Sequence, residues 1–586
     1  MPLHRETPLL DNVSHPTPFE LAAAAVQDWL DGPGATIVTR VSRHDKSCKF
    51  GAWEMHLPHP VVGRQRVRLS LLNDFPASPP QVHFDKKLCL IWPHVEETGR
   101  FCHGVEPGPR DYADPTQVIQ SVLKRVQAFW ENTESSRWVS AEFQRESLSY
   151  WMRYCRVFQH SRGRRSVQNA RVYYPDVDGV VEGKSASYFD GRGKNMRCRL
   201  LLASVGEQDP NVVAQQHGWS SGSLVRGHTL FVPLPDTTPW TPSEWPQTLA
   251  ALGELVDGVT GNQNTLGAWL NEKVRQQQLS LLVVVVQRNV CYGFQIVAPL
   301  VQRLTPPQVT PIALERIDPD WALARDQQLP VLRERRQRRL LVLGCGSLGA
   351  PIAELLARAG IGELHLLDME NFEAPNCARH VLGAHEIGEG KADALSKRLR
   401  LSTPGLQVKG LSATAASYIA SKCKPGDYDL VVDCTGESSV RTVLAHYRDA
   451  SLGDCPVIHA WMEPFCSAAH AVFVARGSKW PIQDPSEKIN VGQWPKDTRV
   501  QLPACGTGFH PYGAADAWQA AGFVVERILA TLRDSTMPST VWSWIRSNAF
   551  FDALGVGVVV NGLVPNSANP VDAIQISRTL LDVVGE

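Results

Sequence analysis

The sequence lacks a CxxC pair and a long apolar segment, and each absence excludes a class of protein. Its 13 cysteines are scattered along 586 residues, so neither a zinc ribbon nor a thioredoxin-type redox couple is expected. An odd number of cysteines favours free thiols over a disulfide framework. No apolar run approaches the ~18 residues that would indicate a transmembrane helix, and MPLHRETPLLDNVSHP at the start lacks a secretory signal pattern. We therefore expect a cytoplasmic protein with no membrane partner.

An excess of charge of one sign is also lacking. Lys+Arg and Asp+Glu number 59 each, which gives a formal net charge of zero. Because proteins that bind nucleic acid through charge carry a basic excess, we expect no direct nucleic-acid binding. A chain of 586 residues is too long for one ordinary core. We predict a multidomain protein divided into residues 1–158, 159–330 and 331–586.

A glycine-rich turn stands near the start of the third predicted domain. Gly344, Gly346 and Gly349 form G-x-G-x-x-G between the strand-like LLVLG and the helical APIAELLARAG. Such a turn lets the backbone approach a phosphate at a helix N-terminus. Asp368 ends the next strand-like segment, nineteen residues after Gly349, where an acid can bind a ribose hydroxyl. The pattern predicts a Rossmann-like α/β nucleotide-binding domain, and an NAD-dependent oxidoreductase is one reading of it.

The residues that follow Asp368 favour a triphosphate over a dinucleotide. Asn376, Arg379 and Lys391 come eight, eleven and twenty-three residues after Asp368. Cationic side chains there would neutralise the β- and γ-phosphates while the α-phosphorus is attacked. Asp433 ends the later segment YDLVVD, at the kind of position where doubly wound sheets place ligand-contacting groups.

Four ordered motifs resemble the adenylating domain of the ubiquitin-activating, MoeB and ThiF family over about residues 335–535: GCGSLGAPIAELLARAGIGELHLLD, NCARH, IGEGKA and VVDCTGESSVR. The resemblance implies ATP-dependent adenylation of a protein's C-terminal glycine with release of pyrophosphate. It also implies a ribose contact from Asp368 and phosphate contacts from Asn376, Arg379 and Lys391.

The resemblance implies magnesium as the metal, with one departure from the family pattern. Gly436 stands where the family usually has a second aspartate, so Asp433 or Glu437 would have to hold the ion. The zinc-binding CxxC pairs of the bacterial biosynthetic members are missing as well, which points away from sulfur-carrier biosynthesis.

Two cysteines compete as the thiol that receives the activated acyl group. A nearby thiolate can capture an acyl adenylate as a thioester and so divide one difficult step into two. Cys505, in QLPACGTGFHPYG, precedes a helical segment where related activating enzymes place their transfer cysteine. Cys466, in EPFCSAAH, leads into a strand-like segment and is better explained as a core residue. We predict Cys505 as the transfer cysteine.

A further cysteine, Cys102, lies in a segment that resembles the ubiquitin-conjugating fold over about residues 20–150. FPASPPQVHF precedes WPHVEETGRFC, and Cys102 follows His94 by eight residues, the family's spacing from its asparagine to its catalytic cysteine. His94 replaces that asparagine, so either its imidazole N–H stabilises the oxyanion or the residue is structural. Asp111 and Asp114 are candidates for orienting an incoming lysine, although a helix cap explains Asp114 as well.

These segments together predict the fold class. It comprises an N-terminal α+β ubiquitin-conjugating-like fold, a middle α/β linker domain and a C-terminal α/β Rossmann-like adenylating domain. RCRLLLASV, HTLFVPLPD and LSLLVVVVQRNV in the middle domain are strand-like, whereas WPQTLAALGELVDGV is helical. No chemical constellation is found there, which favours a scaffold.

The order of the modules resembles the fusion enzymes of bacterial CBASS anti-phage operons. It implies transfer of an activated carboxylate from Cys505 to Cys102 and then to an amine on a target. The implied substrate is the C-terminus of a cGAS/DncV-like nucleotidyltransferase. A homodimer is also implied, with Arg333 and Arg335 of RERRQRR as candidates to reach across its interface. Alternatives are an NAD-dependent oxidoreductase, a ubiquitin-like conjugation system outside CBASS, and an inactive conjugating fold that serves as an interaction module.

Overall fold

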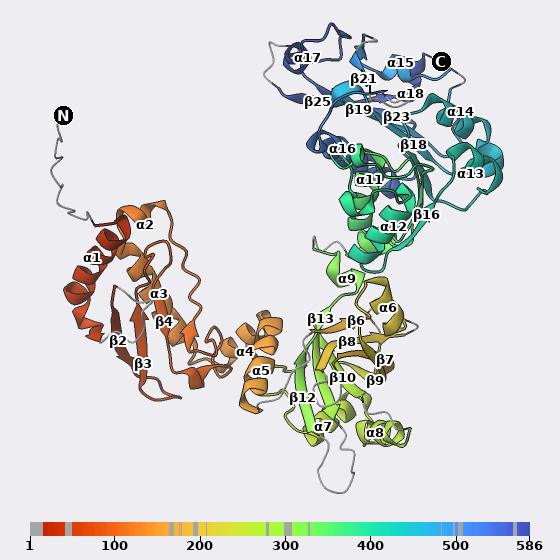
Figure 1. Cartoon of the computed structure of the whole chain (residues 1–586). Coiled ribbons are helices and arrows are strands. Elements are labelled where there is room, and N and C mark those ends of the chain that lie inside the picture. The colour runs from red at the N-terminus through yellow and green to blue at the C-terminus, as the bar shows by residue number, and fades with distance from the viewer. Residues whose placement is uncertain are drawn as a thin grey trace, which may run out of the picture. The chain divides into compact units, whose positions relative to one another are not determined.

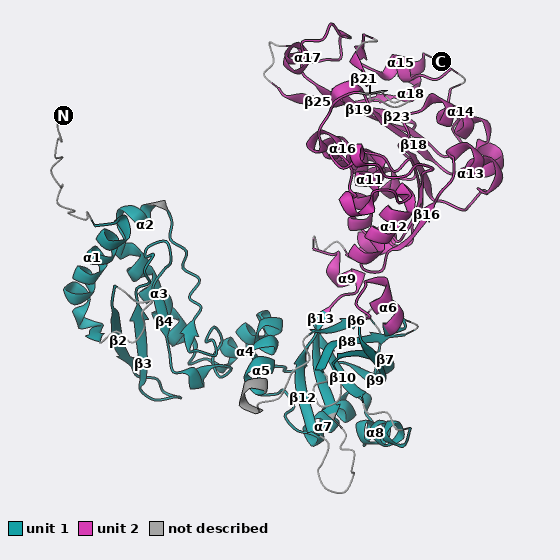
Figure 2. Ribbon diagram, viewed as in Figure 1, with its two compact units in different colours: residues 1–172, 176–210, 221–315 teal, residues 173–175, 211–220, 316–586 magenta. Residues whose placement is uncertain are grey.

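The computed structural model of the chain (Figure 1) describes residues 16–41, 50–162, 169–174, 176, 178–191, 197–206, 208–276, 280–297, 308–325, 329–481, 483–495, 498–501, 508–566 and 571–585. The chain divides into two compact units (Figure 2). The first comprises residues 1–172, 176–210 and 221–315, and the second comprises residues 173–175, 211–220 and 316–586. Within the described ranges, no helix has both the length and the apolar character needed to cross a membrane.

The first unit begins with a helix and a five-stranded antiparallel sheet, and the α+β fold predicted for this part is confirmed. Helix α1 (Pro18–Asp31) starts with a capping box, in which Thr17 and Glu20 satisfy each other's backbone N–H groups. The sheet has the order β1-β2-β3-β4-β5. Its strands are β1 (Thr39–Val41), β2 (Ala52–Leu57), β3 (Gln65–Ser70), β4 (Gln81–His83) and β5 (Arg100–Phe101). Residues of α1, the sheet and α3 (Thr116–Asn132) share one buried apolar core.

Helices α4 (Ser136–Arg145) and α5 (Ser147–Arg162) lead from this domain to the middle sheet. Trp151 of α5 is fully buried, and its indole nitrogen donates a hydrogen bond of 3.2 Å to the carbonyl oxygen of Ile312 in the middle sheet. Tyr150, Tyr154 and Cys155 of α5 belong to the same core as that sheet. The predicted boundary at residue 158 therefore falls inside α5.

The middle sheet has eight strands in the order β12-β11-β10-β9-β7-β8-β6-β13. They are β6 (Asn169–Tyr173), β7 (Val181–Asp190), β8 (Arg197–Val205), β9 (Ser223–Pro233), β10 (Ser280–Gln287), β11 (Val290–Val297), β12 (Gln308–Ala313) and β13 (Glu315–Arg316). Helices α7 (Leu249–Thr260) and α8 (Thr265–Arg275) connect β9 to β10, which pair in parallel. The strand-like and helical segments predicted here are present.

The second unit contains an eight-stranded sheet in the order β16-β15-β14-β17-β18-β19-β23-β25. The strands are β14 (Arg339–Leu343), β15 (Glu363–Leu367), β16 (Gln407–Leu411), β17 (Leu430–Asp433), β18 (Val457–Met462), β19 (Ala468–Val474), β23 (Thr540–Arg546) and β25 (Ala573–Thr579). Neighbouring strands are parallel in the part of the sheet formed by β16, β15, β14, β17 and β18. β19, β23 and β25 continue the sheet in antiparallel pairs. The predicted α/β fold is therefore present.

Helices cover both faces of this sheet (Figure 1). Leu340 and Val342 of β14 pack in the core that contains residues of α11 (Gly349–Arg358), α12 (Lys391–Ser402) and α16 (Ala514–Arg533). Leu341 and Leu343 alternate with them and pack in the opposite core, with residues of α13 (Ala415–Ser421) and α14 (Ser438–His446). A central strand buried on both faces explains the uninterrupted apolar run LLVL.

Shorter elements complete both units. In the first unit they are α2 (Pro109–Ala113) and the 3-10 turns Pro33–Thr36 and Lys86–Leu88. The remaining helices are α6 (Pro210–Gln216), α9 (Pro319–Ala322), α10 (Leu329–Arg335), α15 (Ser486–Ile489), α17 (Asn548–Leu554) and α18 (Leu580–Val584). Two strand pairs join β20 (Gly492–Gln493) to β24 (Val559–Val560) and β21 (Val500–Gln501) to β22 (Gly508–Phe509).

Candidate functional site

The glycine turn lies at the carboxyl end of β14, where the chain order of the parallel strands changes direction across the sheet. Gly344 has a left-handed backbone with φ +81°, and its N–H donates to Leu367 O. A Cβ on Gly349 would lie 1.8 Å from Gly344 O, so only glycine lets α11 pack this closely against the turn. A Cβ on Gly346 would meet nothing within 4 Å. Gly346 therefore leaves open space beside the helix N-terminus, as a phosphate cradle requires.

Two side chains outside the turn fix its shape. The carboxylate of Asp368 accepts hydrogen bonds from the backbone N–H groups of Cys345, at 2.7 Å, and Glu370, at 2.8 Å. His380 Nδ1 accepts from Leu382 N, so the ring proton is on Nε2, which lies 2.6 Å from Cys345 O. Burial lowers the pKa of His380 and favours this neutral form. The motif NCARH predicts roles for Asn376 and Arg379, but its letters alone do not indicate this role for His380.

A cavity of about 380 Å³ opens at this turn. Its volume is within the range of roughly 300–1,000 Å³ that small-molecule sites occupy. It lies at the carboxyl ends of β14, β15 and β17, which is where doubly wound sheets bind their ligands. The lining residues are Gly344, Gly346, Leu367, Asp368, Met369, Glu370, Ala413, Thr414, Ala415, Ala416, Cys434, Thr435, Glu437, Ser439, Val440 and Val443.

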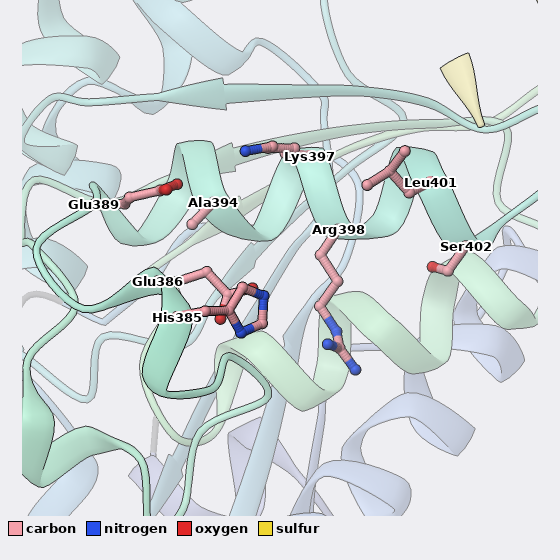
Figure 3. A pocket seen from close by; sticks show the side chains of 8 residues that line it. All are labelled: His385, Glu386, Glu389, Ala394, Lys397, Arg398, Leu401 and Ser402. Carbon is pink, nitrogen blue, oxygen red and sulfur yellow. The ribbon is translucent and has the colours of Figure 1, made fainter. Parts of the chain in front are cut away.

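A second cavity of about 450 Å³ lies along α12 (Figure 3). Its lining residues are His385, Glu386, Glu389, Ala394, Lys397, Arg398, Leu401 and Ser402. Figure 3 shows Lys397 and Arg398 leaving the helix in different directions, so they do not converge on one anion. The predicted nucleotide-binding residues are absent from this lining, and we assign the candidate nucleotide site to the cavity at the glycine turn.

The predicted cationic and amide groups lie between the end of β15 and the first residue of α12. Lys391 begins α12, is nearly buried, and its ammonium group lies 2.5 Å from Glu370, which lines the cavity. Arg379 lies over the ring of Tyr512 at 5.4 Å, and the hydroxyl of Tyr512 is bonded to Ser347 of the glycine turn. Asn376 Oδ1 accepts from Glu373 N and caps a short turn. Lys391 thus contacts a lining residue and Arg379 contacts a partner of the glycine turn, and none of Asn376, Arg379 and Lys391 lines the cavity.

The two carboxylates considered for magnesium have different surroundings. Asp433 is 1% exposed, and its oxygens are bonded to His459 Nδ1, Thr435 N and Thr435 Oγ1. Glu437, by contrast, lines the cavity. No cluster of three or more His, Cys, Asp or Glu side chains among the described residues has a metal-binding arrangement. The donor set fits a magnesium ion that is held largely by phosphate oxygens with one carboxylate, as is usual for this metal.

Cys102 lies in the first unit directly after β5, and its side chain is exposed. Its backbone N–H donates a hydrogen bond of 2.9 Å to His94 O. His94 has a left-handed backbone with φ +60°, a conformation that asparagine and histidine adopt more readily than most residues. Its ring Nε2 lies 3.0 Å from Glu142 Oε2 of α4. An ionised carboxylate only accepts hydrogen bonds, so Nε2 carries the proton and directs it at Glu142.

The two aspartates considered for amine orientation lie in and after α2. Both oxygens of Asp114 accept hydrogen bonds at the start of α3, from Thr116 and Gln117. The hydrogen bond from the Thr116 side chain is the main cause of the lowered pKa of Asp114. The capping interpretation of Asp114 therefore has direct structural support. Asp111 belongs to α2.

Cys505 lies outside the described residues, because the structure resumes at Gly508 after Gln501. Its competitor Cys466 is fully buried and directs its thiol at Asp516 O, at 3.3 Å. Burial raises the pKa of Cys466 to about 12, so its thiol stays protonated at neutral pH. Cys466 thus has the environment of a core residue.

Comparisons with known proteins match both modules. Residues 322–477 match the model of the ThiF family, and residues 45–159 match that of prokaryotic E2 family B. A protein of Vibrio cholerae named ATP-dependent ubiquitin transferase-like protein Cap2 is 31% identical over 249 residues, covering 39% of this chain and 40% of that protein. The mouse adenylyltransferase and sulfurtransferase MOCS3 is 38% identical over 148 residues, covering 24% of this chain and 32% of that protein.

Solved structures with partial likeness include Escherichia coli MccB with MccA-N7isoASN. The match covers 44% of this chain and 76% of that chain, with 15% identity and a TM-score of 0.29. The chain spans less than half of the length of the curated relatives that it matches. The chain thus contains a segment that matches prokaryotic E2 family B and includes His94 and Cys102, and a segment that matches the ThiF family and includes the glycine turn.

Proposed function

We propose that this chain uses ATP to adenylate the C-terminal glycine of a protein substrate and then conjugates that carboxylate to an amine. The observation that carries the proposal is the presence, in one chain, of a glycine turn whose cavity is lined by Asp368 and of an exposed cysteine in a segment that matches prokaryotic E2 family B. An NAD-dependent oxidoreductase would use the turn and Asp368 but would leave Cys102 and its whole domain without a role.

In the proposed first step, the ThiF-family segment binds ATP at the glycine turn. Asp368 binds the ribose, and the N–H groups at the start of α11 face the phosphates. Asn376, Arg379 and Lys391 stabilise charge on the phosphates as the substrate carboxylate attacks the α-phosphorus and pyrophosphate leaves. A magnesium ion would neutralise phosphate charge, with Glu437 as the carboxylate that reaches it. Asp433 then serves instead to hold Thr435 and His459.

In the proposed second step, the acyl group passes between thiols. The Cys505 thiolate attacks the acyl adenylate, forms a thioester and releases AMP. The Cys102 thiolate attacks that thioester, and the Cys505 thiolate leaves. The acceptor amine then forms an amide, and Cys102 leaves as a thiolate. Thioester exchange is nearly balanced in energy, so ATP consumption and amide formation give the sequence its direction.

The proposed substrate is the C-terminus of a cGAS/DncV-like nucleotidyltransferase, as in a CBASS operon. The relatives named ubiquitin transferase-like protein Cap2 support a conjugating role. We also propose a homodimer through the adenylating half. Arg333 and Arg335 make contacts within the chain, to Asp320 Oδ2 and Ala359 O, so reaching a partner would require these contacts to change.

The experiment that tests this function incubates the full chain with ATP, magnesium and a cGAS/DncV-like nucleotidyltransferase. We expect an adduct on the chain that disappears with a thiol reductant. Cys102→Ala should keep an adduct on Cys505 and lose the amide product, whereas Cys505→Ala should lose both adducts and keep substrate-dependent pyrophosphate exchange. The matched control is the same nucleotidyltransferase without its last residue. Adducts that form without ATP, or tight NAD binding without ATP binding in calorimetry, would contradict the proposal.

A further inference from the structure

Three hydrogen bonds hold His94 beside Cys102. Its backbone oxygen accepts from Cys102 N at 2.9 Å, and its backbone N–H donates to Tyr150 Oη at 2.9 Å. Its imidazole Nε2 lies 3.0 Å from Glu142 Oε2. A left-handed backbone at a residue other than glycine persists only where its surroundings impose it. The position of the Cys102 backbone therefore depends on groups in α4 and α5.

One face of α5 holds the loop that follows His94. Tyr150 is 2% exposed, and burial raises its pKa, so its hydroxyl stays protonated. Three residues later, Arg153 Nη1 donates to Val95 O at 3.1 Å. Arg156 lies a further three residues along and forms an ion pair of 2.9 Å with Glu97. Residues three apart lie on one helix face, so Tyr150, Arg153 and Arg156 form a single contact surface.

Trp151, the residue that follows Tyr150 in α5, packs against the middle sheet. The ring of Trp151 packs against Tyr292 and Phe294 of β11, with ring centroids 5.2 Å and 5.1 Å away. Its indole N–H donates to Ile312 O of β12. α5 thus contacts the Cys102 loop through Tyr150 and the middle sheet through Trp151. The middle domain is therefore part of the support of the cysteine loop.

We propose that Tyr150 and Glu142 are positioning residues for acyl transfer from Cys102, an inference that rests on the proposed function. In that transfer, the amine nitrogen bonds to the thioester carbonyl carbon, the C–S bond breaks, Cys102 leaves as a thiolate and the amine proton passes to solvent. Tyr150 and Glu142 touch none of these atoms and act through His94. While Nε2–H is directed at Glu142, it is not available to an oxyanion at Cys102. The imidazole therefore has a structural role, which is to attach the loop to α4.

The test loads Cys102 directly, without ATP. The full chain is treated with the mercaptoethanesulfonate thioester of acetyl-Gly-Gly, and the acyl group on Cys102 is followed by peptide mapping as free lysine is added. We expect Tyr150→Phe and Glu142→Ala to slow discharge by about tenfold or more, since small misplacements of reacting groups are costly. Glu142→Gln keeps an acceptor for Nε2–H and should stay within about threefold of wild type. The matched control is Glu131→Ala, an exposed carboxylate of α3.

A series of lysine concentrations separates positioning from amine binding. The maximal discharge rate should fall, and the lysine concentration at half-maximal rate should stay unchanged. Wild-type discharge in both Tyr150→Phe and Glu142→Ala, or a Glu142→Gln rate as low as that of alanine, would overturn the inference. If Glu142→Ala fails to fold, Tyr150→Phe decides, because it removes one oxygen atom. Failure of the wild-type chain to load Cys102 would instead overturn the proposed function.

Discussion

At the scale of single residues, two glycines of one turn differ in what a methyl group would meet. Gly349→Ala places Cβ 1.8 Å from Gly344 O, whereas Gly346→Ala places it in open space. We expect Gly349→Ala to destabilise the fold by about 2 kcal/mol, since overpacking forces the backbone to move. Gly346→Ala should keep the thermal midpoint and weaken ATP binding, because its methyl group fills the phosphate cradle.

Thermal unfolding and calorimetry with ATP separate these two outcomes. The matched control is Gly253→Ala in α7 of the middle domain, where a Cβ also meets nothing within 4 Å. Unchanged ATP affinity in Gly346→Ala would contradict the assignment of the phosphate site to this turn.

His380 gives the glycine turn a dependence on pH. Burial lowers its pKa in the folded protein, so the folded state favours the neutral ring. Stability from such a group is present above its unfolded pKa of about 6.5 and is lost as the pH falls toward the lower folded value. The midpoint difference between wild type and His380→Ala should therefore shrink as the pH is lowered from about 7.5 to about 5.5. Thermal melts of both proteins across this range test the prediction, and a difference that is constant with pH would contradict it.

At the scale of elements, local sequence patterns predicted the strands, turns and helices that adjacent residues specify, but not the contacts between residues far apart in the sequence. The strand, glycine turn and helix from Leu340 to Arg358 are specified by adjacent residues, so their form was predictable. The Rossmann-like sheet and the E2-like α+β fold followed from ordered motifs. By contrast, Glu142 lies 48 residues from the His94 ring that it contacts, and Ile312 lies 161 residues from Trp151. No local pattern reports such contacts, and for that reason the partner of His94 and the support from α5 were missed.

The hydrogen bond between the hydroxyl groups of Tyr512 and Ser347 links two distant segments of the second unit. Tyr512 precedes α16, follows β22 and also lies beneath Arg379. Tyr512→Phe removes the hydroxyl and keeps the ring. We expect pyrophosphate exchange to fall by about fivefold, which corresponds to the roughly 1 kcal/mol net value of one hydrogen bond. Tyr418→Phe, a hydroxyl bonded to Tyr428 in the same unit, is the control, and equal exchange rates in the two variants would contradict the prediction.

At the scale of the whole molecule, the first unit should unfold as one body. The fragment of residues 1–158 contains most of α5 but lacks the sheet that covers Trp151, Tyr154 and Cys155. We expect this fragment to bind a hydrophobic dye and to melt at least about 5 °C below the fragment of residues 1–315, because apolar side chains lose their cover. Calorimetry of both fragments measures the difference. Equal midpoints without dye binding would show that the conjugating-like domain ends before α5.

The double attachment of α5 also constrains how genes for such proteins exchange parts. After a recombination event at the codon for residue 158, the descendant would have most of α5 from one parent and the middle sheet from the other. The sheet would then pack against a helix with which it did not evolve. Trp151 would then need a new acceptor in place of Ile312 O, whereas Tyr150 would keep its contact with His94 N. Lineages that acquire a different conjugating-like domain should therefore acquire it together with the middle sheet, in a single gene segment.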